Sequence, residues 1–134
     1  MFSHVTLGTD DLDRARAFYD AVLARLGLEL APSEPGAFAA WKGGDGVARF
    51  YVVRPRNGAA ASVGNGVTVA FEAPDRAAVD AGHAAGLSQG GSDEGAPGLR
   101  PIYHPDFYGA YLRDPDGNKI ALVCHAPPAA IAQP

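Results

Sequence analysis

The chain has 134 residues, of which 47% are hydrophobic and 19% are charged, and its formal net charge is −4. This length fits one domain with a substantial core, and the composition is that of a globular protein rather than a disordered one. The 11 scattered Lys and Arg residues argue against nucleic acid or an anionic membrane as a partner, and the single cysteine, Cys124, excludes an intrachain disulfide and a zinc finger.

The N-terminal segment predicts a half-buried strand. Over residues 3–9, Val5 and Leu7 fall on one face and His4 and Thr6 on the other. The segment lacks the basic and apolar regions of a signal peptide, and no window approaches the roughly 18 apolar residues of a membrane span. We therefore expect a cytoplasmic protein.

A helix and three short strands are expected next. Residues 10–27 carry apolar residues at helical spacing behind a capping aspartate, Asp10 or Asp11, and Gly27 is suited to end the helix. Three stretches then have strand character, with a hairpin-type GGDG turn between the last two: 28–31, 38–42 and 47–54.

The same order begins again after a linker at 56–65. A strand at 67–73 and a helix at 75–86 are followed by a glycine-rich stretch at 86–98, an aromatic segment, and strands at 108–113 and 119–124. A shift of 64 residues pairs Val5 with Val69 and the capping Asp11 with Asp75.

We predict a single α+β domain over 1–134, built from two βαβββ modules at about 1–55 and 66–126, with a short tail at 127–134. One unit of about 60 residues is marginal alone, so the two modules should pair their sheets. Helices on one face of the sheets leave the other face as a groove or for a second covering layer.

The chain resembles the vicinal oxygen chelate superfamily of glyoxalases, bleomycin-resistance proteins and extradiol dioxygenases. The resemblance rests on the opening strand with His4, the segment DLDRARAFYDAVL at 11–23, the doubled module and the closing DPDGNKIALV at 114–123. It implies eight strands that form an incomplete barrel around a ligand, often within a homodimer. Metal-dependent relatives place His or Glu ligands on the first and last strand of each module, where a divalent metal polarises the substrate.

Most of the four strand positions that carry metal ligands in the family have no metal-binding side chain in this sequence. His4 matches on the first strand, and residues 47–54 contain no His, Asp or Glu. Thr68 takes the place opposite His4 in the second module, with Glu72 near the far end of that strand, and Ala121 stands where relatives commonly carry Glu. Because a metal site normally needs three or more protein ligands, we expect no bound metal.

Residues 99–114 hold the densest set of polar and aromatic side chains. Tyr103, His104 and Tyr111 are predicted to line a small-molecule pocket, since such side chains combine an apolar body with a hydrogen-bonding group. Thr68 is a further predicted ligand-binding residue. His104 is the candidate general acid or base, because burial or Asp106 can move the pKa of an imidazole across neutrality. The alternative is a surface loop whose aromatic residues cap the barrel edge.

Other candidates have two interpretations. Trp41 belongs either to the core or to the mouth of the cup. Arg49 and Tyr51 share one face of their strand. If that face points inward, Arg49 favours an anionic ligand; if it points outward, Arg49 is a surface charge. His4 is a second tentative catalytic residue facing the cup. We expect three other residues to take no part in catalysis. His83 should be a solvated helix residue and Cys124 a buried inert thiol. His125 should point to the opposite face of the strand from Cys124, so the two cannot form a nucleophile pair.

The function predicted is that of a glyoxalase/bleomycin-resistance-like protein with a degenerate metal site, which binds a small organic molecule in its cup. It would sequester this molecule or transform it without a metal. One alternative is a metal-dependent lyase or dioxygenase of the glyoxalase type, with ligands from unexpected places such as His4 with His104 or Glu72. The other is a dimeric interaction module.

Overall fold

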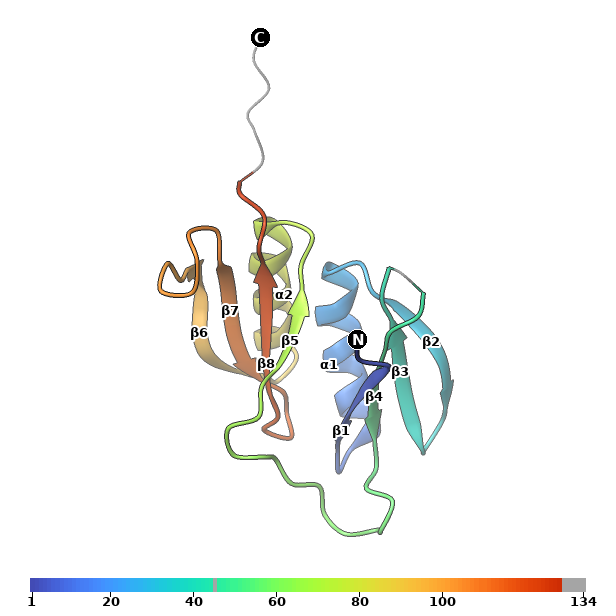
Figure 1. Cartoon of the computed structure of the whole chain (residues 1–134). Helices are drawn as coiled ribbons and strands as arrows, with labels where there is room; N and C mark the ends of the chain where they lie inside the picture. The colour runs from blue at the N-terminus through green and yellow to red at the C-terminus, as the bar shows by residue number, and fades with distance from the viewer. Residues whose placement is uncertain (45, 129–134) are drawn as a thin grey trace.

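The computed structural model describes residues 1–44 and 46–128, and these form two βαβββ modules side by side (Figure 1). Asp45 and most of the predicted tail, 129–134, lie outside the described residues. The first module comprises β1 (His4–Gly8), α1 (Leu12–Arg25), β2 (Glu29–Glu34), β3 (Phe38–Lys42) and β4 (Arg49–Val53). The second comprises β5 (Val69–Glu72), α2 (Arg76–Ser88), β6 (Ser92–Leu99), β7 (Tyr108–Arg113) and β8 (Lys119–Cys124).

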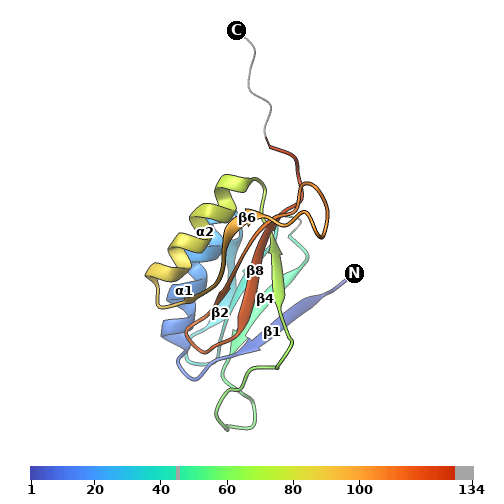
Figure 2. The same ribbon diagram turned by 90° about the vertical axis from the view of Figure 1, so that its left-hand side faces the viewer.

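Each module forms its own four-stranded sheet with the same topology. The strand orders are β1-β4-β3-β2 and β5-β8-β7-β6, and in each sheet the first and last strand of the module pair in parallel. Both helices cover the same side of the molecule, and the opposite sheet faces are open (Figure 2). This confirms the predicted α+β fold, with two sheets that do not close into a barrel within the described residues. None of the helices in those residues is long and apolar enough to cross a membrane.

The two capping aspartates act as the sequence predicts. Asp11 accepts a hydrogen bond from the backbone N–H of Arg14 at 3.1 Å, and Asp75 accepts one from Ala78 at 2.7 Å. Each carboxylate satisfies a backbone donor that the first helical turn leaves free. Gly27 adopts φ +82°, a left-handed conformation that favours glycine and ends α1.

The predicted βαβββ order implied a strand between α2 and β7, but the sequence assigned no residues to it, and β6 lies in the glycine-rich stretch. Its residues have little strand propensity, and its pairing with β7 is interrupted by two register shifts around Gly95. It is an edge strand, so only one neighbour holds it in place. Pairing with β7 therefore decides its conformation.

The prediction for His83 is wrong. Only 6% of the residue is exposed, and its Nε2 lies 2.9 Å from a carboxylate oxygen of Asp93 on β6. The helix buries one stripe of residues against the sheet and α1, and His83 falls on that stripe one turn after Val79. His83 thus links α2 to the edge strand.

The DPDGN segment joins the second module to the first. Asp114 accepts a hydrogen bond from the hydroxyl of Tyr19 on α1 at 2.7 Å, in the core. Asp116 accepts from Thr9 Oγ1 at 2.6 Å, and Asn118 Nδ2 donates to the carbonyl of Gly8 at 3.0 Å. Phe50 and Phe71 also meet edge to face, with centroids 4.9 Å apart, so the modules share one core.

Candidate functional site

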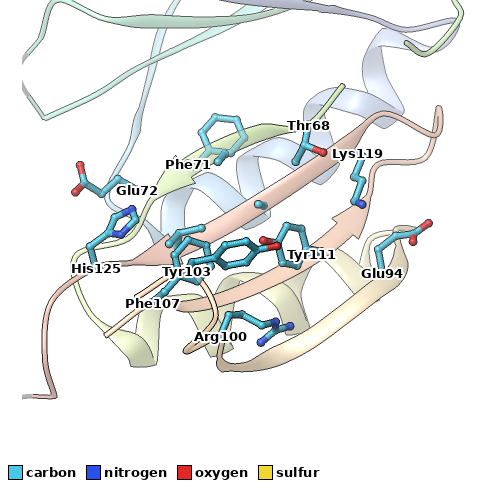
Figure 3. A pocket seen from close by; sticks show the side chains of 13 residues that line it. Thr68, Phe71, Glu72, Glu94, Arg100, Tyr103, Phe107, Tyr111, Lys119 and His125 are labelled. Carbon is cyan, nitrogen blue, oxygen red and sulfur yellow. The ribbon is translucent and has the colours of Figure 1, made fainter. Parts of the chain in front are cut away.

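A cavity of about 800 Å³ lies on the open face of the second sheet (Figure 3). Strand alternation creates it: Ile120, Leu122 and Cys124 of β8 are buried in the core, so the residues between them face the opposite side. Small side chains form its floor, and polar and aromatic side chains surround it. The lining residues are Thr68, Ala70, Phe71, Glu72, Glu94, Arg100, Tyr103, Phe107, Tyr111, Lys119, Ala121, Val123 and His125.

Tyr111 of β7 lies between two cations in this cavity. Its ring centroid is 5.7 Å from the guanidinium of Arg100 and 5.5 Å from Lys119 Nζ. Burial raises the pKa of Tyr111, with a smaller contribution from nearby Tyr103 and an opposing one from Arg100. The hydroxyl therefore stays protonated and can donate a hydrogen bond, and its ring has a cation near it on β8 and another at the end of β6.

Segment 100–107 forms one wall of the cavity. Arg100 donates to the carbonyls of Ala96 and Gly98 at 2.8 and 2.7 Å, which holds the guanidinium beside Tyr111. Tyr103 packs on Phe107 with centroids 4.8 Å apart. An ion pair of 3.5 Å between Asp106 and Arg76 ties the segment to α2. The aromatic segment is thus anchored at both ends.

The predicted residues of the second module therefore come together. Thr68, Tyr103 and Tyr111 all line the cavity. His104 is not among the lining residues; its Nε2 lies 2.8 Å from Nδ1 of His125, and its own Nδ1 accepts from the backbone N–H of Asp106 at 3.1 Å. His125 itself lines the cavity, although the sequence prediction set it aside. The signal was the alternation of β8, because His125 continues the row of Lys119, Ala121 and Val123 by one more step of two.

The predicted residues of the first module form a separate group. His4, Arg49 and Tyr51 do not line the cavity, and β1 pairs with β4 so that His4 lies opposite Arg49. The rings of His4 and Tyr51 meet edge to face with centroids 5.6 Å apart. Phe50 and Val52 are buried, so Arg49 and Tyr51 occupy the open face of the sheet. Arg49 Nη1 donates to the carbonyl of Gly46 at 2.6 Å.

Trp41 is a core residue. It is 1% exposed, packs on Tyr19 and Phe50, and donates its indole N–H to Asp20 at 3.0 Å. Of the two interpretations left open by the sequence, burial in the core is the one observed. Cys124 is likewise buried, as expected.

The residues present do not fit the metal centre of the family type. Ala121, at the position of the common Glu, contributes only a methyl group to the cavity floor, and Thr68 supplies a neutral hydroxyl. Across residues 1–44 and 46–128, no three His, Cys, Asp or Glu side chains lie close enough together to hold a metal ion.

Comparisons with known proteins identify the family. Residues 1–122 match the model of the Glyoxalase/Bleomycin resistance protein/Dioxygenase superfamily. A glyoxalase/bleomycin resistance protein from Albidiferax ferrireducens T118 is similar in structure, with a TM-score of 0.82, 40% identity, and coverage of 94% of this chain and 99% of that one. No curated protein matches the chain.

More distant structures have the same fold. A lactoylglutathione lyase from Agrobacterium tumefaciens has a TM-score of 0.63 and 26% identity over 92% of each chain. A glyoxalase/bleomycin resistance protein from Streptomyces sp. CB03234 has a TM-score of 0.61 and 21% identity, over 90% of this chain and 96% of that one. The family model and the 40% identical structure together show that the chain belongs to the glyoxalase/bleomycin resistance protein/dioxygenase superfamily.

Proposed function

We propose that the protein binds a small, planar organic anion in the cavity of the second sheet, without a metal ion. The observation that carries this proposal is Tyr111 between Arg100 and Lys119 above a floor of small residues. Ala70 and Ala121 leave a flat apolar surface on which a ring can lie. Aromatic walls with a few placed polar groups are typical of small-molecule sites.

The charge of the ligand follows from the partners of the lining residues. Glu94 is paired with Arg113 at 2.6 Å. Within the described residues, neither Arg100 nor Lys119 has an acidic partner, and the guanidinium of Arg100 is held by backbone carbonyls instead. Glu72, the other acidic lining residue, lies beside His125 and away from Lys119 and Arg100 (Figure 3). The two cations at the other end of the cavity therefore favour a carboxylate or a similar anion there.

Thermal unfolding and calorimetry with matched aromatic compounds test the proposal. Biphenyl-4-carboxylate should bind and raise the melting temperature, whereas the uncharged biphenyl-4-carboxamide should bind at least about tenfold more weakly, because it loses the charge-assisted contacts. Lys119→Gln should remove most of this difference. Arg56→Gln, an exposed cation in the linker, is the control and should leave it unchanged.

Equal binding of the acid and the amide would contradict the proposal, as would a loss of the preference in Arg56→Gln. Mass spectrometry of the recovered compound distinguishes sequestration from transformation. An unchanged compound indicates sequestration.

A further inference from the structure

Two histidines form a hydrogen-bonded pair at the end of the cavity opposite to Lys119 (Figure 3 shows His125 there). The rings of His104 and His125 are nearly parallel, at 25°, with centroids 5.1 Å apart. Phe107 packs edge-on against both rings, at 5.7 and 5.5 Å. The segment that carries His104 is tied to α2 by the ion pair of Asp106 with Arg76. Packing and hydrogen bonds therefore orient both rings, and His125 is exposed on the side that faces the cavity.

The backbone of Asp106 sets the direction of the hydrogen bonds in this pair. A backbone N–H can only donate, so His104 Nδ1, which it contacts at 3.1 Å, carries no proton. The neutral ring of His104 then has its proton on Nε2, in the bond to His125. His125 Nδ1 must accept that proton, and neutral His125 carries its own proton on Nε2. The chain of donors thus ends in one N–H of His125.

We propose that His125 presents this fixed N–H to the bound ligand and that His104 is the residue that positions it. The inference rests on the proposed binding function. His125 lines the cavity, and among residues 1–44 and 46–128 its ring has no hydrogen-bond partner besides His104. Its Nε2–H is left for an acceptor on the ligand. In this state Nε2 already holds a proton, so His125 is a donor and not a general base.

The position of His125 also defines the ligand. Lys119, Ala121, Val123 and His125 follow one another on one side of β8 and its extension, which spans about 20 Å at roughly 3.3 Å per residue. The anion belongs near Lys119 and Arg100, and a carbonyl oxygen belongs at the far end. We infer an elongated planar acid with a carbonyl group opposite to its carboxylate.

Two probes of nearly equal shape test this inference. In 4′-acetylbiphenyl-4-carboxylate the terminal carbonyl can accept a hydrogen bond, and in 4′-isopropenylbiphenyl-4-carboxylate the planar isopropenyl group cannot. Calorimetry on the wild type should give about five- to tenfold tighter binding of the acetyl compound, the effect of one hydrogen bond. His125→Ala should abolish this preference. His104→Ala should weaken it, and His104→Gln should restore it, because the amide of Gln can donate to His125 Nδ1.

Nitrogen NMR of the histidine side chains gives a second measurement that needs no ligand. Both His104 and His125 should carry their proton on Nε2 in the wild type, and His125 should become a mixture of tautomers in His104→Ala. A proton on Nδ1 of His125 in the wild type would overturn the inference.

Ligand binding separates this inference from the proposed function. If both probes bind equally well, the binding function stands and the role of His125 is wrong. A preference that persists in His125→Ala has the same meaning. If neither probe binds, the proposed function fails and the ligand assigned here fails with it.

Discussion

Replacing Tyr19 by phenylalanine tests the contact between the DPDGN segment and α1. The Tyr19 hydroxyl is buried and donates to Asp114 Oδ2 at 2.7 Å, and Asp114 is only 3% exposed. After Tyr19→Phe, Oδ2 keeps one protein donor, Asn118 Nδ2 at 2.9 Å. The substitution leaves the ring and its packing in place, so the change in stability reports the hydrogen bond.

The expected loss is about 2 kcal/mol, because a hydrogen bond to a charged group contributes about 1.5–3 kcal/mol. For a chain of 134 residues this corresponds to a decrease of about 7 °C in melting temperature. Urea unfolding followed by fluorescence measures it directly, since Trp41 lies in the same core with its ring 5.8 Å from that of Tyr19. Tyr51→Phe, on the open face of the first sheet, is the control and should change stability by less than about 0.5 kcal/mol.

Alkaline pH should reduce the advantage of the wild type. Burial raises the pKa of Tyr19 well above its ordinary value of 10.0, and the negative charge of Asp114 adds to the shift. Above about pH 10 the unfolded chain loses a phenolic proton that the folded chain retains, so the folded state loses stability as pH rises. Phenylalanine has no such proton. The difference between wild type and Tyr19→Phe should therefore be constant from neutral pH to about pH 9 and shrink above it.

Equal losses of stability in Tyr19→Phe and Tyr51→Phe at neutral pH would contradict a stabilising hydrogen bond between Tyr19 and Asp114. A difference between wild type and Tyr19→Phe that does not change above about pH 10 would separately contradict the assigned burial of the hydroxyl.

Three further substitutions test other parts of the fold. Gly86→Ala on α2 should destabilise the protein by about 1–3 kcal/mol in thermal unfolding, because the added methyl would clash with Leu112 and lie 3.2 Å from Phe18. Ala usually favours a helix, so a more stable variant would contradict this packing. Asp93→Asn should lower stability at neutral pH, since hydrogen bonds from the backbone of Gly95 and from His83 lower the pKa of Asp93. In urea unfolding this loss of stability should be full above about pH 4 and should disappear at lower pH. A loss that does not depend on pH would contradict the role of the Asp93 carboxylate. Thr9→Val should lower the free energy of unfolding by about 1–2 kcal/mol in the same assay, because it removes the hydroxyl that donates to Asp116 at 2.6 Å and leaves that carboxylate one donor short. Unchanged stability would argue against this contact between the modules.

Local sequence patterns determined much of the fold. The caps at Asp11 and Asp75, the apolar stripe of α1 and the two final strands depend on residues that are close in sequence, so periodicity and capping chemistry predict them. The repeat of these patterns predicted the two modules. Ala121 could also be placed on the cavity side, because strand alternation fixes its face relative to Ile120 and Leu122.

Contacts between distant segments needed the tertiary structure. Strand β6 forms because β7 supplies its hydrogen bonds, and the buried ring of His83 gains a hydrogen-bond partner because β6 brings Asp93 to it. His104 and His125 are 21 residues apart in sequence, and the docking of the 100–107 segment beside the end of β8 makes them a pair. The sequence alone thus determined every element except β6, and the faces of most of their side chains. Which of these faces meet was decided by sheet pairing and helix packing, because such contacts depend on register between segments that local propensity does not specify.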